Sequence, residues 1–132
     1  MPETLLGFDF GTKRIGVAVG QSLTGTAAPL TTLVTINGKP DWEAIGALIA
    51  EWKPAAFVLG FPVDLDGSEN DIADRVKKFA RQLHGRYHLP VHLIDETLSS
   101  IEAERHSGPK ARSEGRNDAI AAAIILETWL NQ

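Results

Sequence analysis

The stretch LLGFDFGTKRIGVAVG, residues 5–20, decides the fold. Its β-branched and aromatic content predicts two antiparallel strands, Leu5–Asp9 and Arg14–Val19, joined by a short turn. Gly11 in this turn suits a backbone position with positive φ. One carboxylate, Asp9, lies inside the first strand. Because a charge is costly to bury without a partner, Asp9 is the first indication of a functional site.

Length and composition predict one folded domain that spans residues 1–132. Hydrophobic residues make up 43% of the chain and charged residues 23%, which are ordinary proportions for a globular protein. The chain contains no cysteine, which excludes disulfides and thiolate metal sites within it. It shows no signal sequence and no apolar run long enough to cross a bilayer. We therefore expect a soluble cytoplasmic protein.

The net charge of −4 argues against a nucleic-acid binder, but the basic residues are not evenly spread. Positions 75–86 hold five Lys or Arg residues and no acid, and positions 105–116 hold four against one acid. Solvated helix faces and a polar loop are one interpretation. The other is a nucleic-acid-binding surface. Its candidate residues are Lys77, Lys78, Arg81, Arg105, Lys110, Arg112 and Arg116.

The rest of the chain alternates strand and helix. Further strands are predicted at 28–36, 55–59 and 91–94. Helices are predicted at 41–52, at 68–84 with Gly85 as its end, at 99–106, and at 117–131 after a polar loop, 107–115. This order predicts an α/β fold: a five-stranded mixed sheet, three antiparallel strands then two parallel, with helices on both faces. The last helix is apolar almost all round, which predicts that it is sandwiched.

Three carboxylates lie where the predicted topology can bring them together. Asp9 is in the first strand, Glu96 follows the last strand, and Asp118 is in the first turn of the closing helix. Two like charges 4 Å apart repel by about 4 kcal/mol at an effective dielectric of 20, and divalent cations remove that cost. Oxygen ligands suit one or two Mg²⁺ or Mn²⁺ ions, and two such ions can activate a water for phosphodiester hydrolysis. Taken singly, Asp118 also suits a helix N-terminus, and Glu96 a strand-end turn.

Four segments, in order, resemble the YqgF-type nuclease family: residues 6–19, 58–68, 94–104 and 117–126. This family is a bacterial relative of the RuvC-type Holliday junction resolvases. It has an RNase H-like fold and is described as a nuclease that matures the 5′ end of pre-16S rRNA. The resemblance implies that Asp9, Glu96 and Asp118 form a catalytic, metal-binding triad. It also implies Mg²⁺ or Mn²⁺ as cofactor, structured RNA as substrate, and a role in ribosome biogenesis.

Two departures from the family pattern affect how the substrate would be bound. Thr97 stands where the family has an arginine, so a guanidinium that could hold phosphate is lost. The loop 107–115 is shorter than usual. Lys13 and Arg14, in the turn beside Asp9, are candidates for phosphate contact, and a solvated turn is the alternative.

Other functions remain open at this point. Residues 9–13 resemble the first phosphate loop of actin-like ATPases and sugar kinases, but those proteins need two lobes to enclose a nucleotide. A Holliday junction resolvase-like DNA endonuclease is a second alternative. A non-catalytic RNA- or ribosome-associated module, which would not require the triad, is a third. The sequence leaves open RNA or DNA, endonuclease or exonuclease, the metal count and the oligomeric state.

Overall fold

The structure is a computed structural model that describes residues 3–61, 71–95 and 115–132. Glu96, Thr97, the predicted helix 99–106 and almost all of the predicted loop 107–115 lie outside these residues. In the described parts of the chain, no helix is both long and apolar enough to cross a membrane.

Five strands form one mixed sheet, in the order β3-β2-β1-β4-β5. The strands are β1 (Thr4–Phe10), β2 (Arg14–Gln21), β3 (Thr26–Val34), β4 (Ala56–Phe61) and β5 (Val91–Asp95). β1, β2 and β3 are antiparallel neighbours, whereas β4 runs parallel to β1 and β5 parallel to β4. The predicted five-stranded mixed sheet is therefore confirmed.

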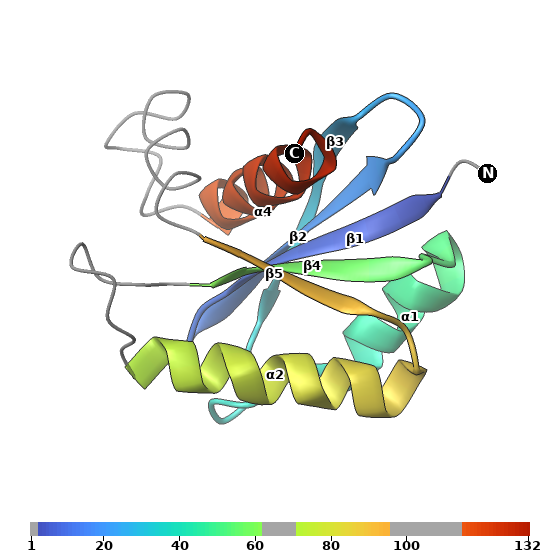
Figure 1. The fold of residues 1–132 in the computed structure, drawn as a ribbon. Helices are drawn as coiled ribbons and strands as arrows, with labels where there is room; N and C mark the ends of the chain where they lie inside the picture. The colour runs from blue at the N-terminus through green and yellow to red at the C-terminus, as the bar shows by residue number, and fades with distance from the viewer. Residues whose placement is uncertain (1–2, 62–70, 96–114) are drawn as a thin grey trace.

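Helices cover both faces of this sheet (Figure 1). They are α1 (Trp42–Trp52), α2 (Asp71–Tyr87) and α4 (Gly115–Leu130). Strand alternation sorts the side chains of β1: Leu6 and Phe8 enter the core with α1 and α2, and Leu5 enters the core with α4. Phe8 meets Phe79 of α2 edge to face, with ring centroids 5.5 Å apart. Each such buried side chain stabilises the fold by about 1.5–3 kcal/mol.

Helix α4 lies close to the sheet because glycines, Gly7 and Gly16 among them, lie beneath it. A Cβ built on Gly7 would lie 2.7 Å from the Cβ of Leu126, and one built on Gly16 would lie 1.9 Å from the carbonyl oxygen of Asp118. The helix was predicted to be sandwiched, and this prediction is wrong. Ala122, Leu126 and their neighbours on one side are buried against the sheet, whereas Ile124 on the other side is only half-buried.

Two glycine predictions are also wrong. Gly85 does not end α2, which continues to Tyr87. The Tyr87 ring packs edge to face against Phe57, 6.1 Å between centroids, and such packing outweighs the cost of about 1 kcal/mol for a helical glycine. Gly11 is absent from the described residues with positive φ. A glycine is needed at this position for a different reason: the carbonyl oxygen of Arg14 lies so close that a Cβ on residue 11 would be 2.6 Å from it.

Candidate active site

The carboxyl ends of β1, β4 and β5 share one edge of the sheet, because these three strands are parallel. Such edges are where ligands bind in open α/β sheets. Asp9 is the second-last residue of β1. Asp95, the last residue of β5, pairs with Phe61 at the end of β4. β5 therefore ends at the same edge as Asp9. Glu96 follows Asp95 in the sequence and lies outside the described residues.

Asp9 faces α4. Along β1 the side chains alternate, and Leu5 and Gly7 both contact α4 residues, which places Asp9 on the same face. Directly opposite Asp9 on β2 is Gly16. The missing side chain of Gly16 is the space into which the backbone of Asp118 packs. Asp9 and the backbone of Asp118, which are 109 positions apart in the sequence, thus both lie beside Gly16, on the face of the sheet that α4 covers.

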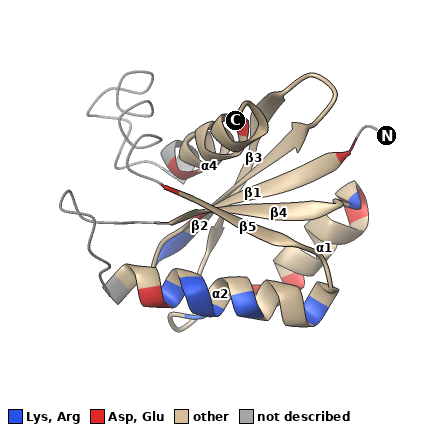
Figure 2. Cartoon of the chain, viewed as in Figure 1, with Lys and Arg blue, Asp and Glu red and all other residues tan. Residues whose placement is uncertain are grey.

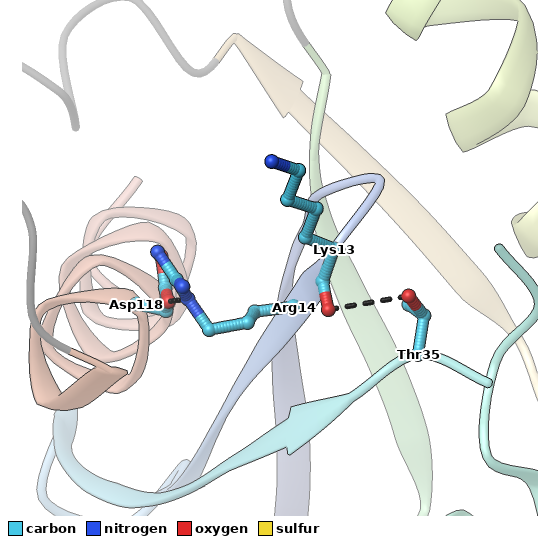
Figure 3. A network of polar contacts seen from close by, with 4 residues as sticks. All are labelled: Lys13, Arg14, Thr35 and Asp118. Atoms are coloured by element: carbon cyan, nitrogen blue, oxygen red, sulfur yellow. Dashed lines mark hydrogen bonds and ion pairs between the residues drawn. The ribbon is translucent and has the colours of Figure 1, made fainter. Parts of the chain in front are cut away.

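Asp118 forms an ion pair with Arg14. The Nε–H of Arg14 donates to Oδ2 of Asp118 at 2.8 Å (Figure 3). The Arg14 side chain is 41% exposed and that of Asp118 is 25% exposed, so water screens the pair and its contribution to stability is about 0–1 kcal/mol. Arg14 lies two residues before Gly16 and therefore faces α4 as well. The sequence suggested Arg14 only as a phosphate contact and did not reveal this pairing.

The turn that carries Lys13 is fixed from outside by Thr35. The Thr35 hydroxyl donates to the carbonyl oxygens of Thr12 and Lys13, at 2.9 and 3.2 Å. The backbone N–H of Thr35 also donates to the carbonyl oxygen of Lys13, at 3.0 Å. The Lys13 side chain extends away from these bonds and is exposed (Figure 3). Lys13 therefore presents an exposed cation from a turn that these hydrogen bonds hold, one residue before Arg14.

The basic residues of α2 lie on the other face of the sheet. Lys78 and Arg81 are exposed along α2, which is visibly rich in Lys and Arg (Figure 2). Lys77 is half-buried, with Nζ 5.5 Å from the centre of the Phe61 ring. The structure does not gather these residues beside Asp9 and Asp118. Of the predicted basic residues in the other segment, Arg105, Lys110 and Arg112 lie outside the described residues, as does the side chain of Arg116.

The two carboxylates suit a divalent metal. Asp9 and Asp118 supply oxygen donors on one face, which hard cations such as Mg²⁺ and Mn²⁺ prefer. Within the described residues, no group of three or more His, Cys, Asp and Glu side chains could hold a metal ion. A complete oxygen site at this edge therefore requires a further donor, and Glu96 is the predicted one.

Comparisons with known sequences connect the chain to a known family. Residues 3–132 match the RuvX family, described as Holliday junction resolvase. A protein of Pseudomonas putida named "Putative pre-16S rRNA nuclease" is 52% identical over 131 residues, covering 96% of this chain and 93% of its own length. A protein of the same name from Glaesserella parasuis serovar 5 is 48% identical, covering 100% and 99%.

Solved structures share the fold. The RuvC of T. thermophilus in complex with a Holliday junction substrate has a TM-score of 0.53 at 17% identity, covering 93% of this chain and 91% of its own. The fowlpox virus resolvase in complex with Holliday junction DNA has a TM-score of 0.57 at 11% identity, covering 97% of both chains. At these identities the likeness concerns the fold alone, and the predicted RNase H-like, RuvC-like architecture is confirmed.

Proposed function

The chain belongs to the RuvX family, and we propose that it is a metal-dependent nuclease that hydrolyses phosphodiester bonds in structured RNA. The observation that carries the proposal is the position of Asp9 and Asp118 beside Gly16: Asp9 pairs with it across β1 and β2, and the backbone of Asp118 packs over it from α4. The name shared by the relatives suggests the 5′ end of pre-16S rRNA as substrate. That substrate would give the protein a cytoplasmic role in bacterial ribosome biogenesis.

In this proposal Asp9, Asp118 and Glu96 hold one or two Mg²⁺ or Mn²⁺ ions. When bound, such ions supply Lewis-acid activation of a water and stabilisation of the leaving oxygen. Glu96 is the donor that the sequence predicts: it directly follows β5, whose Ile94 packs in the core with α4. The protein's own contribution is to fix the carboxylates by packing α4 directly on β2.

The basic residues bind the phosphate backbone in this proposal. Lys13 and Arg14 are closest to the carboxylates and would contact the phosphates nearest the cleaved bond. The α2 residues Lys78 and Arg81, together with Lys77, would hold a more distant part of the RNA that passes around the edge of the sheet. Arg105, Lys110 and Arg112, from the segment before α4, and Arg116, in the first turn of α4, would add further contacts. Such binding is strongly salt-dependent and reads shape more than base sequence.

A DNA junction is the second candidate substrate, because the family is described as Holliday junction resolvase. The experiment therefore compares three labelled substrates: a precursor of the 16S rRNA 5′ end, a single-stranded RNA and a four-way DNA junction. Each is incubated with Mg²⁺, with Mn²⁺ and with chelator. Asp9→Asn protein is the control, because it keeps the shape of the side chain and removes its charge.

We expect metal-dependent cleavage of the precursor RNA that Asp9→Asn abolishes while RNA binding persists. Preferential cleavage of the four-way junction would show that the same site acts on DNA. Binding without cleavage of any substrate, or equal cleavage by the wild type and Asp9→Asn, would overturn the proposal. The first of these results would leave a non-catalytic RNA-binding module as the function.

A further inference from the structure

Asp118 already has a cation beside it in this structure. The Nε–H of Arg14 occupies one side of Oδ2 at 2.8 Å, and Arg14 is held in β2 directly opposite Val34 of β3. The guanidinium takes up part of the hydrogen-bonding capacity of this carboxylate, and its positive charge opposes the approach of a second cation. The two cations therefore compete for the same carboxylate.

The partner that can move is Arg14 rather than Asp118. The backbone of Asp118 lies against Gly16 so closely that even a methyl group would not fit between them. Helix α4 therefore fixes where Asp118 can be. The Arg14 side chain has four rotatable bonds and is 41% exposed, so it can leave the carboxylate and still have water around it.

We propose that Arg14 is a resident counter-cation of Asp118 that a divalent metal displaces, and that the released guanidinium then binds a phosphate of the substrate. This inference rests on the proposed metal-dependent nuclease. Repulsion disfavours both cations on the same carboxylate, and the double charge of the metal ion favours the metal over the guanidinium. In the absence of metal, Arg14 neutralises Asp118. In its presence, Arg14 joins Lys13 of the neighbouring turn as a phosphate ligand.

The guanidinium suits this second task. Its planar fork binds two phosphate oxygens at once, which an ammonium group cannot do. Arg14 is anchored between Lys13 and Ile15, and the turn before it is fixed by Thr35. A short swing of the side chain therefore keeps it at the carboxyl edge of the sheet. Metal binding would thus both complete the acidic site and prepare a ligand for the phosphate.

The direct test is the affinity for Mn²⁺ alone, measured by calorimetry on the whole chain without nucleic acid. Arg14→Gln removes the competing charge, and we expect it to bind Mn²⁺ about fivefold more tightly than the wild type, the size of an exposed ion pair. Lys13→Gln is the matched control. It removes the same charge one residue away without a contact to Asp118, and we expect a smaller change in its affinity.

A second variant shows that the effect passes through Asp118. In an Asp118→Asn background the carboxylate is gone, so Arg14→Gln is expected to leave the remaining Mn²⁺ affinity unchanged. Thermal unfolding of each variant shows whether it is folded. Because Arg14 is half-exposed, its substitution is expected to leave the unfolding temperature within a few degrees of the wild type.

The transfer of Arg14 to phosphate has its own readout. RNA binding is measured against salt concentration, once with Mn²⁺ and once with chelator, with both proteins carrying Asp9→Asn so that they do not cleave, and gels verify that the RNA stays intact. With Mn²⁺, Arg14→Gln is expected to lower the salt slope by about one. With chelator, the slopes of the variant and the wild type are expected to agree, because Asp118 then holds Arg14.

The outcomes separate this inference from the function on which it rests. If neither protein binds Mn²⁺, the metal-dependent nuclease itself is wrong. If both bind Mn²⁺ with equal affinity, the competition is wrong. If Arg14→Gln binds it more weakly, the competition is also wrong, and Arg14 instead supports Asp118 as a ligand. A salt slope that Arg14→Gln lowers equally with and without metal would overturn the transfer to phosphate.

Discussion

Replacing Gly16 by alanine tests the contact that brings the two carboxylates together. The added Cβ would lie 1.9 Å from the carbonyl oxygen of Asp118, 2.2 Å from its carbonyl carbon and 2.8 Å from the backbone nitrogen of Ala119. All three atoms belong to the backbone, so no side chain can turn aside. Since ordinary contact begins at 3.4 Å, the first turn of α4 must retreat by about 1.5 Å.

This retreat has two measurable consequences. Because the added methyl group meets backbone atoms, we expect a destabilisation at the upper end for overpacking, about 3 kcal/mol. For a chain of this size, that loss lowers the unfolding temperature by about 10 °C. The carboxylate of Asp118 also moves away from Asp9. Misplacement of about 1 Å can slow catalysis by about 100-fold, so cleavage should fall by at least that factor even where Gly16→Ala remains folded.

Gly20→Ala is the matched control for Gly16→Ala. Its Cβ would also meet α4, at 2.7 Å, but the atom it meets is Cδ2 at the flexible end of Leu126. We expect a smaller loss, about 1 kcal/mol by thermal or urea unfolding, and cleavage close to the wild-type rate. Equal stability of Gly16→Ala and the wild type would refute the reasoning, as would full cleavage activity in Gly16→Ala.

Three further substitutions test other parts of the structure. Gly85→Ala should raise the unfolding temperature by a few degrees, because its Cβ would meet nothing within 4 Å and alanine favours the helix by about 1 kcal/mol; a lower temperature would contradict this. Asp41 Oδ1 caps α1 by accepting a hydrogen bond from the backbone N–H of Ala44 at 3.1 Å. Asp41→Ala should therefore lower the free energy of unfolding, measured with urea, by about 1 kcal/mol, whereas Asp41→Asn should lower it little. Lys78→Gln combined with Arg81→Gln should lower the salt slope of RNA binding by about one to two without changing stability. An unchanged slope would show that RNA does not contact α2.

The sheet could be predicted from the sequence because its signals are local. Each strand is a short run of apolar and β-branched residues, and turn residues separate them. The alternation of strand and helix after the first three strands then leaves few topologies, since crossovers are right-handed. The same reasoning placed Asp9 and Asp118 near each other, because one ends a strand and the other begins the closing helix.

What the sequence did not reveal depends on contacts between distant residues. The pair between Arg14 and Asp118 joins positions 104 apart, and nothing in the local pattern of either residue indicates it. In the sequence alone, Gly16 looks like an ordinary glycine within a strand, and only the structure shows that α4 packs on it. Gly7 and Gly20 also face α4, so glycines recurring on one face of a hairpin were the available signal.

Gly85 shows the opposite error. Its weak helix propensity is a local property, and tertiary packing of the residues around it overrides that preference. The basic residues show a third limit. A count of Lys and Arg identifies α2 as cationic, but only the topology shows that α2, which carries Lys78 and Arg81, packs on the face of the sheet opposite to α4.

The central claim is that Asp118 acts in phosphodiester cleavage together with Asp9. It is tested most directly by the rate at which Asp118→Asn cleaves the labelled precursor RNA with Mg²⁺, beside Glu127→Gln as control. Glu127 is an exposed carboxylate of the same helix, far from the edge that carries Asp9. We predict that Asp118→Asn binds the RNA and loses cleavage, whereas Glu127→Gln cleaves at the wild-type rate. Cleavage by Asp118→Asn at the wild-type rate would contradict the account.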